Sequence, residues 1–407
     1  MTSPKATREL TKNHNRDLVL KLIIDNYSTS RADIARETKL TRTTVSDVVS
    51  GLIAEGLVQE IGLGESKGGK PSILISLVPN SRYLIGINLT QDKFIGSIVN
   101  LRGEIKKTVE VPVTTSDRDQ ALDLLYHILD ELLASEWKPV IGIGVGTPGL
   151  INTRDGILIN AVNLDWHDLP LARLISQRCS LPVSLLNDSQ AAAIGEFVYG
   201  EHTGSSNLIV VTVQHGVGAG ILVNGQIFQG DGGGAGEIGH IVMQKDGELC
   251  RCGRRGCLET VASARAVTQH VQERAHLSEP VSFDGVERAF RSGDAVVCEV
   301  VLEAGMYLGR ALGSLVGALN IETIILTGDM THFGAEWLAA VRQSMQETAL
   351  ERMTQQTRVE FGRLDYRATI LGASAHLLLD NYALLFRQTE NSPRPTYAPL
   401  TAPRSLA

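Results

Sequence analysis

The feature that most constrains the fold is a short segment, residues 240–257, which holds one histidine and three of the chain's five cysteines. The residues that can bind a metal there are His240, Cys250, Cys252 and Cys257. Three thiolates and one imidazole at this density are the ligand set of a tetrahedral Cys₃His zinc site. A disulfide or a group of buried thiols is the alternative. We expect structural Zn²⁺, because a closed four-ligand site leaves no coordination position for chemistry.

The length of 407 residues leaves room for two or three domains. The chain has no apolar run near the about 18 residues of a membrane span and no recognisable secretory leader, so we expect a cytoplasmic protein without membrane insertion. Residues 1–80 carry 11 Lys and Arg against 9 Asp and Glu, and the remainder carries 27 against 36. A weakly basic head on an acidic body is compatible with a DNA-binding module fused to a second function.

The head has the pattern of a helix-turn-helix. Residues 16–26 repeat apolar side chains at helical spacing, and Ser30–Asp33 reads as a capping box that opens a second helix. That helix is expected to end at Lys39 and Leu40, and Thr41 opens a third. The predicted inner face of the third helix is formed by Val45, Val48, Leu52 and Ile53.

A predicted hairpin follows these helices. Residues 57–61 and 73–77 have strand character, and the Gly- and Lys-rich residues 62–71 between them form the tip of a wing. A three-helix bundle with a surface hairpin is the alternative. The candidate DNA contacts are Arg42, Thr43, Thr44 and Ser46 on the third helix, with Lys67 and Lys70 at the wing tip. Each helix residue taken singly is equally compatible with a solvated helix face.

From Leu84 the chain changes to an α/β pattern, with two strand-rich sets that are each followed by helices. This order predicts two lobes with a cleft between them. The expected domains are the head at 1–80, a first lobe at 81–197 completed by a helix near 370–387, a second lobe at 198–369, and a disordered Pro-rich tail at 388–407.

Polar residues cluster where the predicted strands end. They are Gly149, Asn187, Asp188, Glu237, His240 and Glu259. Carboxylates suit sugars because each accepts hydrogen bonds from adjacent hydroxyl groups, so the set predicts a polyol pocket, although each residue alone could be a turn or helix cap. One imidazole nitrogen of His240 could bind zinc while the other faces the ligand. The pocket walls are expected near residues 149–165, including Asn163, Asp165 and Trp166.

The order of these motifs resembles the ROK family of repressors, open reading frames and sugar kinases. The resemblance covers residues 84–385 and depends most on residues 236–240 and on the segment from Cys250 to Glu259. It implies a two-lobed actin-like ATPase fold, assembly as dimers or tetramers, and sugar contacts by Asn187, Asp188, Glu237, His240 and Glu259. Asp188 occupies the position of the general base of the kinases. The head in front of the motifs resembles the repressor branch.

The family's nucleotide-binding motifs are altered in this chain. Residues 88–93 read Asn-Leu-Thr-Gln-Asp-Lys where the kinases resemble Asp-x-Gly-Gly-Thr-Lys, so both glycines are replaced and Asp92 adds a negative charge. Residues 214–218 keep two glycines of the second phosphate loop and lose its leading Gly and Thr. These changes argue against ATP binding.

The sequence therefore predicts a sugar-responsive, DNA-binding transcriptional regulator, a repressor of carbohydrate uptake or catabolism genes, that does not phosphorylate its sugar. Operator DNA, a monosaccharide or sugar-phosphate effector and a second copy of the chain are the expected partners, and a protein regulator remains open. The alternatives are an ATP-dependent ROK sugar kinase with a regulatory head and a protein-interaction adaptor.

Overall fold

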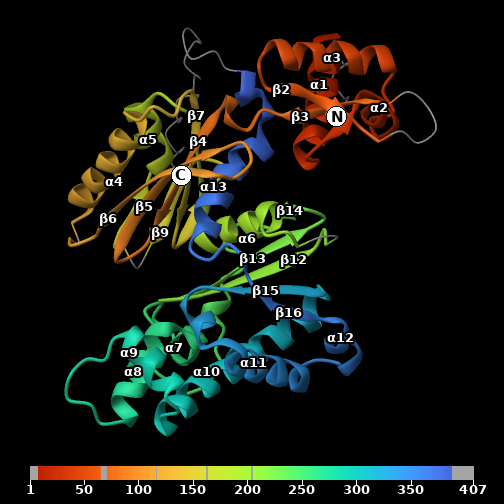
Figure 1. Cartoon of the computed structure of the whole chain (residues 1–407). Helices are drawn as coiled ribbons and strands as arrows, with labels where there is room; N and C mark the ends of the chain where they lie inside the picture. The colour runs from red at the N-terminus through yellow and green to blue at the C-terminus, as the bar shows by residue number, and fades with distance from the viewer. Residues whose placement is uncertain (1–7, 66–70, 116, 162–163, 203–204, 387–407) are drawn as a thin grey trace, which may run out of the picture. The chain divides into compact units, whose positions relative to one another are not determined.

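The computed structural model describes residues 8–65, 71–115, 117–161, 164–202 and 205–386 (Figure 1). The chain forms two compact units. The smaller comprises the chain up to Val78 together with the described residues from Asn381, and the larger comprises residues 79–380. No helix in the described ranges is both long and apolar enough to cross a membrane.

The smaller unit contains a helix-turn-helix and a β hairpin. Its elements are α1 (Arg8–Asp25), β1 (Thr29–Ser30), α2 (Arg31–Thr38), α3 (Arg42–Ala54), β2 (Val58–Leu63), β3 (Ile73–Leu77) and the 3₁₀ turn η4 (Tyr382–Phe386). The strands form a sheet in the order β1-β3-β2, so the predicted hairpin is present and β1 adds a third strand. Lys67 and Lys70, at the predicted wing tip, lie outside the described residues.

Both predicted helix starts in the head are confirmed. The hydroxyl of Ser30 accepts from the backbone N–H of Asp33 at 3.2 Å and donates to its carboxylate at 2.6 Å. Lys39 adopts a left-handed conformation that ends α2. Thr41 caps α3 by accepting from the backbone N–H of Thr44 at 3.2 Å. These local bonds satisfy N–H groups that a helix leaves without partners at its start.

The predicted inner face of α3 is partly wrong. The buried residues are Val45, Val49 and Leu52, whereas Val48 and Ile53 are only half-buried. Spacings of four and three residues follow the 3.6-residue repeat, which places Val49 rather than Val48 in line with Val45 and Leu52.

The C-terminal segment belongs to the smaller unit, which differs from the expected helix over 370–387. The last helix ends at Asp380, and η4 follows it. Leu384 and Leu385 are buried, and the guanidinium of Arg16 on α1 lies 3.8 Å from the ring centroid of Phe386. Burial raises the pKa of the Tyr382 hydroxyl to about 12, with a further contribution from the carboxylates of Asp25 and Asp17.

The larger unit contains two five-stranded sheets. The first has the order β11-β7-β4-β5-β6 and the second β14-β13-β12-β15-β16. The first consists of β4 (Tyr83–Leu89), β5 (Lys93–Asn100), β6 (Ile105–Pro112), β7 (Val140–Thr147) and β11 (Val183–Asn187). The second consists of β12 (Leu208–Val213), β13 (Val217–Val223), β14 (Gln226–Ile227), β15 (Thr323–Thr327) and β16 (Arg358–Phe361). A small sheet is formed by β8 (Leu150–Asn152), β9 (Ile157–Ala161) and β10 (Trp166–Leu169).

Helices cover both sheets. They are α4 (Arg118–Leu133), α5 (Leu171–Cys179), α6 (Asp188–Tyr199), α7 (Glu259–Ala262), α8 (Ala264–Arg274), α9 (Phe283–Arg291), α10 (Ala295–Leu319), α11 (Gly334–Thr348), α12 (Glu351–Gln356) and α13 (Arg367–Asp380), with 3₁₀ turns η1 (Pro79–Ser81), η2 (Ile238–His240) and η3 (Asp329–Phe333).

The two sheets repeat one topology, which is the two-lobed actin-like fold that the sequence predicts. In each, three strands are antiparallel neighbours and two more continue the sheet in parallel. Between the sheets, α13 packs on β4 and β7 while α6 packs on β12 and β13, and the two helices pack on each other (Figure 1). A Cβ on Gly195 would lie 2.1 Å from the backbone oxygen of Ala368, so this close packing requires glycine.

Trp166 lies in the core of the first lobe rather than in a pocket wall. Its side chain is buried, and its ring lies edge-on to Phe94 at a centroid distance of 6.1 Å. Asp165 is exposed, and Asn163 lies outside the described residues. A large aromatic ring gains more from burial than from a place at a wetted rim, and sequence spacing does not reveal that choice.

Because η4 belongs to the smaller unit, truncation of one of its buried leucines should destabilise that unit and not the larger one. Leu385→Ala should destabilise the smaller unit by about 2–5 kcal/mol, because it removes a buried side chain and leaves a cavity. Hydrogen exchange read segment by segment should accelerate in α1, α2 and α3 and stay unchanged in β4 and β7. Leu379→Ala is the matched control, since Leu379 is exposed and its loss should change stability by less than about 0.5 kcal/mol. Acceleration confined to the larger unit would contradict the assignment.

Candidate functional site

The predicted metal ligands come together in the second lobe. His240, Cys250, Cys252 and Cys257 place their ligand atoms within 4.8 Å of one another. His240 is the last residue of η2, and the cysteines lie on the loop between η2 and α7. Isolated β bridges pair Val242 with Cys257 and Leu249 with Arg255, so the loop folds back on itself and brings both ends to the cluster.

The spacing of these atoms fits a tetrahedral zinc ion. The Sγ atoms of Cys252 and Cys257 are 3.7 Å apart, and Cys250 Sγ lies 3.6 Å from Nδ1 of His240. Zn–S bonds of about 2.3 Å and a Zn–N bond of about 2.0–2.1 Å give tetrahedral edges of roughly 3.8 Å and 3.6 Å. The thiols are free, and 3.7 Å is far longer than a disulfide bond of about 2.05 Å. The cluster can therefore hold a metal of this kind.

Three carboxylates converge beside this cluster. Asp188 begins α6, Glu237 precedes η2, and Glu259 begins α7. Burial raises the pKa of Glu237 to about 7, with contributions from the negative charges of Asp188 and Glu259. Burial also raises the pKa of Asp188, and Glu259 adds to this shift. Because the charges of Asp188 and Glu259 both act on Glu237, the three carboxylates form one cluster, which favours hydrogen-bond donors such as sugar hydroxyls.

His240 joins the metal cluster to the carboxylates. Its Nδ1 faces Cys250, while its Nε2 lies 3.9 Å from a carboxylate oxygen of Glu237. The two ring nitrogens therefore face different sets of residues. A metal on Nδ1 fixes the ring and leaves Nε2–H as a donor toward the carboxylate side.

Asn187 and Gly149 connect neighbouring strand ends through the backbone. The Asn187 side chain caps α6 by accepting from the N–H groups of Ser189 and Gln190, at 2.9 Å and 3.3 Å, and it donates to Gly149 O at 3.1 Å. A Cβ on Gly149 would lie 2.2 Å from the backbone oxygen of Asn160, and its φ is +102°. Both residues thus hold the strand ends together.

The turn at the altered first phosphate motif is held by hydrogen bonds and an ion pair of its own side chains. Residues 90–93 form a tight turn in which the Thr90 hydroxyl lies within hydrogen-bond distance of two acceptors, the Asp92 carboxylate at 2.6 Å and Lys93 O at 2.7 Å. Lys93 pairs with Glu110 at 3.0 Å. The lysine and the hydroxyl that could meet a phosphate are therefore both engaged in the fold.

Two arginines beside Glu259 are absent from the sequence prediction. Arg251 lies 3.8 Å and Arg265 lies 3.9 Å from one carboxylate oxygen of Glu259, whose other oxygen accepts from Val217 N at 3.3 Å. The position of Arg251 between two metal ligands is visible in the sequence, but the direction of its side chain is not. Nothing in the spacing of Arg265 marks it.

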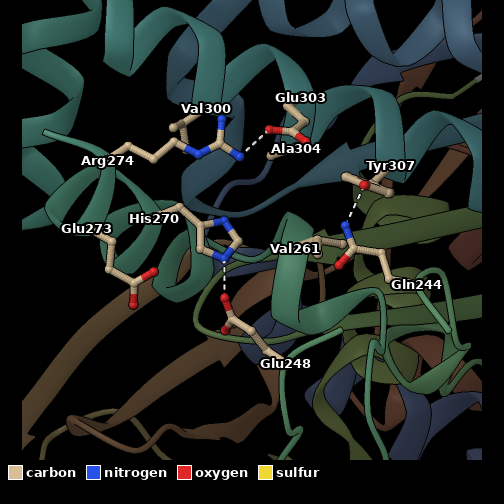
Figure 2. A pocket seen from close by; sticks show the side chains of 10 residues that line it. All are labelled: Gln244, Glu248, Val261, His270, Glu273, Arg274, Val300, Glu303, Ala304 and Tyr307. Carbon is tan, nitrogen blue, oxygen red and sulfur yellow. Dashed lines mark hydrogen bonds and ion pairs between the residues drawn. The ribbon is translucent and has the colours of Figure 1, made fainter. Parts of the chain in front are cut away.

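A separate pocket of about 220 Å³ lies between the cysteine loop and helices α8 and α10 (Figure 2). Its polar side chains pair with one another: His270 contacts Glu248 at 2.8 Å and Arg274 contacts Glu303 at 2.6 Å. Both pairs join different elements, so they fasten the cysteine loop and the two helices together.

The candidate DNA contacts lie at the start of α3. Arg42 and Thr43 are exposed, and Ser46 is half-buried. The hydroxyl of Thr44 is 2.8 Å from that of Thr41, so it also contributes to the helix cap.

The fold and the site define a protein with a helix-turn-helix head and a two-lobed, sugar-kinase-type body. The ROK family model matches residues 84–379, and the chain belongs to the ROK family. It is 32% identical to the xylose repressor of Caldicellulosiruptor bescii, over 91% of this chain and 97% of the repressor. It is 33% identical to a glucokinase of Halalkalibacterium halodurans, over 77% of this chain and 97% of the kinase. A solved ROK transcriptional regulator, a homologue of the E. coli MLC protein, matches with a TM-score of 0.80 and 28% identity, over 92% of this chain and 97% of its own.

The metal cluster predicts a change that can be measured directly. Cys257→Ser should abolish stoichiometric zinc in the purified protein, because a buried hydroxyl replaces a thiolate ligand. Metal analysis by mass spectrometry, with hydrogen exchange over residues 237–259, measures the loss and the loosening of the loop. Cys298→Ser is the matched control, since Cys298 lies outside the cluster. Zinc retained at full occupancy in Cys257→Ser would contradict the ligand assignment.

Proposed function

We propose that the chain is a sugar-responsive transcriptional repressor that binds operator DNA through α3 and a monosaccharide or sugar phosphate in the cleft, without phosphorylating it. The observation that carries the proposal is the combination of a DNA-binding type of head with the carboxylate–histidine pocket in one chain. The similarity to a xylose repressor extends over both parts, whereas the similarity to a glucokinase covers 77% of this chain. Carbohydrate uptake or catabolism genes are the expected targets.

In the sugar pocket, hydroxyl groups would donate to Asp188, Glu237 and Glu259. The Nε2–H of His240 would donate to a hydroxyl oxygen, and the backbone held by Gly149 and Asn187 would set the depth of the pocket. A zinc ion would supply no chemistry here. It would keep the ring of His240 in one orientation and hold the loop that leads to Glu259.

Several features argue against kinase activity. The turn at residues 90–93 is satisfied internally, and Asp92 would repel a triphosphate. Asp188, at the position of the kinase base, then acts only as a hydroxyl acceptor. Phosphoryl transfer depends on positioning and charge stabilisation, so loss of the phosphate cradles removes most of what such a catalyst needs.

In the head, α3 would enter the major groove of DNA with Arg42, Thr43, Thr44 and Ser46 at its leading end. Lys67 and Lys70 at the wing tip would contact the phosphate backbone or the minor groove. A homodimer or homotetramer would read two half-sites about one or more helical turns apart. Binding of sugar would shift the operator affinity by its differential affinity for two states, typically about 1–3 kcal/mol.

The sugar pocket predicts the effect of one conservative change. Glu237→Gln should weaken binding of the best sugar in a panel of glucose, N-acetylglucosamine, mannose and xylose by at least about tenfold, because an amide NH₂ donor replaces one of the two acceptor oxygens. Calorimetry measures the affinity, and the same samples with ATP and Mg²⁺ should form no sugar phosphate. Glu336→Gln, an exposed change on α11, should leave the affinity unchanged. Turnover at about 1–100 s⁻¹, as in ordinary kinases, would refute the repressor reading.

The proposed DNA contacts of α3 predict the effect of a second substitution. Arg42→Ala should weaken binding to the DNA immediately upstream of the chain's own gene by about 1–3 kcal/mol. Affinity of the unmodified protein should also fall steeply with salt, because phosphate contacts release counterions. Fluorescence anisotropy at several salt concentrations measures both. Arg352→Ala removes the same charge from α12, where it is exposed, and should bind normally. Equal weakening by both variants would show that only net charge matters.

A further inference from the structure

The guanidinium groups of Arg251 and Arg265 lie close together, between the proposed sugar-binding carboxylates and the two altered phosphate-binding motifs. Arg251 lies on the cysteine loop, between Cys250 and Cys252, and Arg265 lies on α8. Both lie near the same oxygen of Glu259. One carboxylate therefore faces two permanent positive charges.

Arg251 lies near both segments that correspond to the phosphate-binding loops of the kinases, residues 88–93 and 214–218. Its guanidinium donates to the side-chain oxygen of Gln91 at 3.3 Å, and Gln91 lies in the first of these loops. His215, in the second loop, is close enough to Arg251 and Arg265 for their charges to act on its imidazole. The pair thus lies at the junction of the sugar pocket with the place where a phosphoryl group would be transferred in a kinase.

The two arginines have N–H donors that are not engaged in good hydrogen bonds. The separations of 3.8 Å and 3.9 Å from Glu259 are too long for good hydrogen bonds. The buried Nε of Arg265 has no hydrogen-bond partner among the residues that the structure describes. Each guanidinium has five N–H donors in a planar fork that matches the oxygens of a phosphate group.

At His215 the charges of the two arginines outweigh those of the nearby carboxylates. Burial lowers the pKa of His215, and the charges of Arg251 and Arg265 lower it further, more strongly than Glu259 and Asp92 raise it. The like charges of Arg251 and Arg265 are also close enough to act on each other. The two guanidinium groups repel each other, and an anion between them would relieve that repulsion.

We infer that Arg251 and Arg265 form a site for the phosphate group of a phosphomonoester, and that the effector is a sugar phosphate whose hydroxyls contact the carboxylates while its phosphate contacts the arginines. This inference rests on the proposed function and specifies its effector. A single phosphate group suits the site better than a triphosphate, because the charges of Glu259 and Asp92 also reach this place, as their effect on His215 shows, and would oppose more negative charge.

The test compares each sugar with its own phosphate. Calorimetry with the full-length protein would use glucose, N-acetylglucosamine and mannose, their 6-phosphates, xylose and its 5-phosphate, and inorganic phosphate alone. At least one sugar phosphate should bind tenfold or more tightly than its parent sugar. Arg251→Gln and Arg265→Gln should each reduce that affinity at least tenfold while changing the affinity for the parent sugar by less than threefold. Inorganic phosphate alone should bind at least tenfold more weakly than the best sugar phosphate.

Arg254→Gln is the matched control, because this exposed arginine lies in the same loop. It should leave the affinities unchanged, and all three variants should keep their zinc content and thermal midpoint. The inference is wrong if the parent sugars bind as tightly as their phosphates, if Arg251→Gln keeps the preference, or if inorganic phosphate binds as tightly as any sugar phosphate. A free sugar that binds and alters operator affinity, without any phosphate preference, would overturn this inference and leave the proposed function standing. Absence of all binding would overturn both.

Discussion

The two nitrogens of one imidazole link the parts of the site. Nδ1 of His240 belongs to the sulfur cluster, and Nε2 faces the carboxylate of Glu237. A ring held on one side by a metal cannot rotate, so the direction of its second N–H is set before any ligand arrives. The same loop continues from Cys257 through Leu258 to Glu259, which begins α7. The cluster therefore positions two of the groups that face the pocket, and a protein without it would have to order a long glycine-rich loop by other means.

The charges of the pocket are arranged in two regions. Asp188 and Glu237, whose pKa values are raised, form an acceptor-rich region that a polyol satisfies without a counter-charge. Arg251 and Arg265 form a donor-rich region across Glu259. Keeping like charges together in a partly buried cleft is costly, and such an arrangement is stabilised when a ligand supplies the complementary groups. A sugar that carries a phosphate has both kinds of group.

The sequence predicts well those features that depend on neighbours along the chain. The caps at Ser30 and Thr41 and the meeting of three cysteines with His240 follow from local spacing. Features that depend on neighbours across space escaped prediction. Trp166 lies in the core, Val49 rather than Val48 faces inward, and η4 belongs to the head, because tertiary packing decides each. Arg251 and Arg265 also escaped, since nothing along the chain shows where a long flexible side chain points.

Helices α6 and α13 pack closely on each other, and the chain continues from α13 into the smaller unit. Asp188 stands at the first turn of α6, and Glu196 near its other end is buried and accepts from the backbone of Arg363 and Leu364 just before α13. The absence of a side chain on Gly195 lets the two helices touch backbone to backbone. The chain then passes directly from α13 into η4, whose leucines are part of the smaller unit.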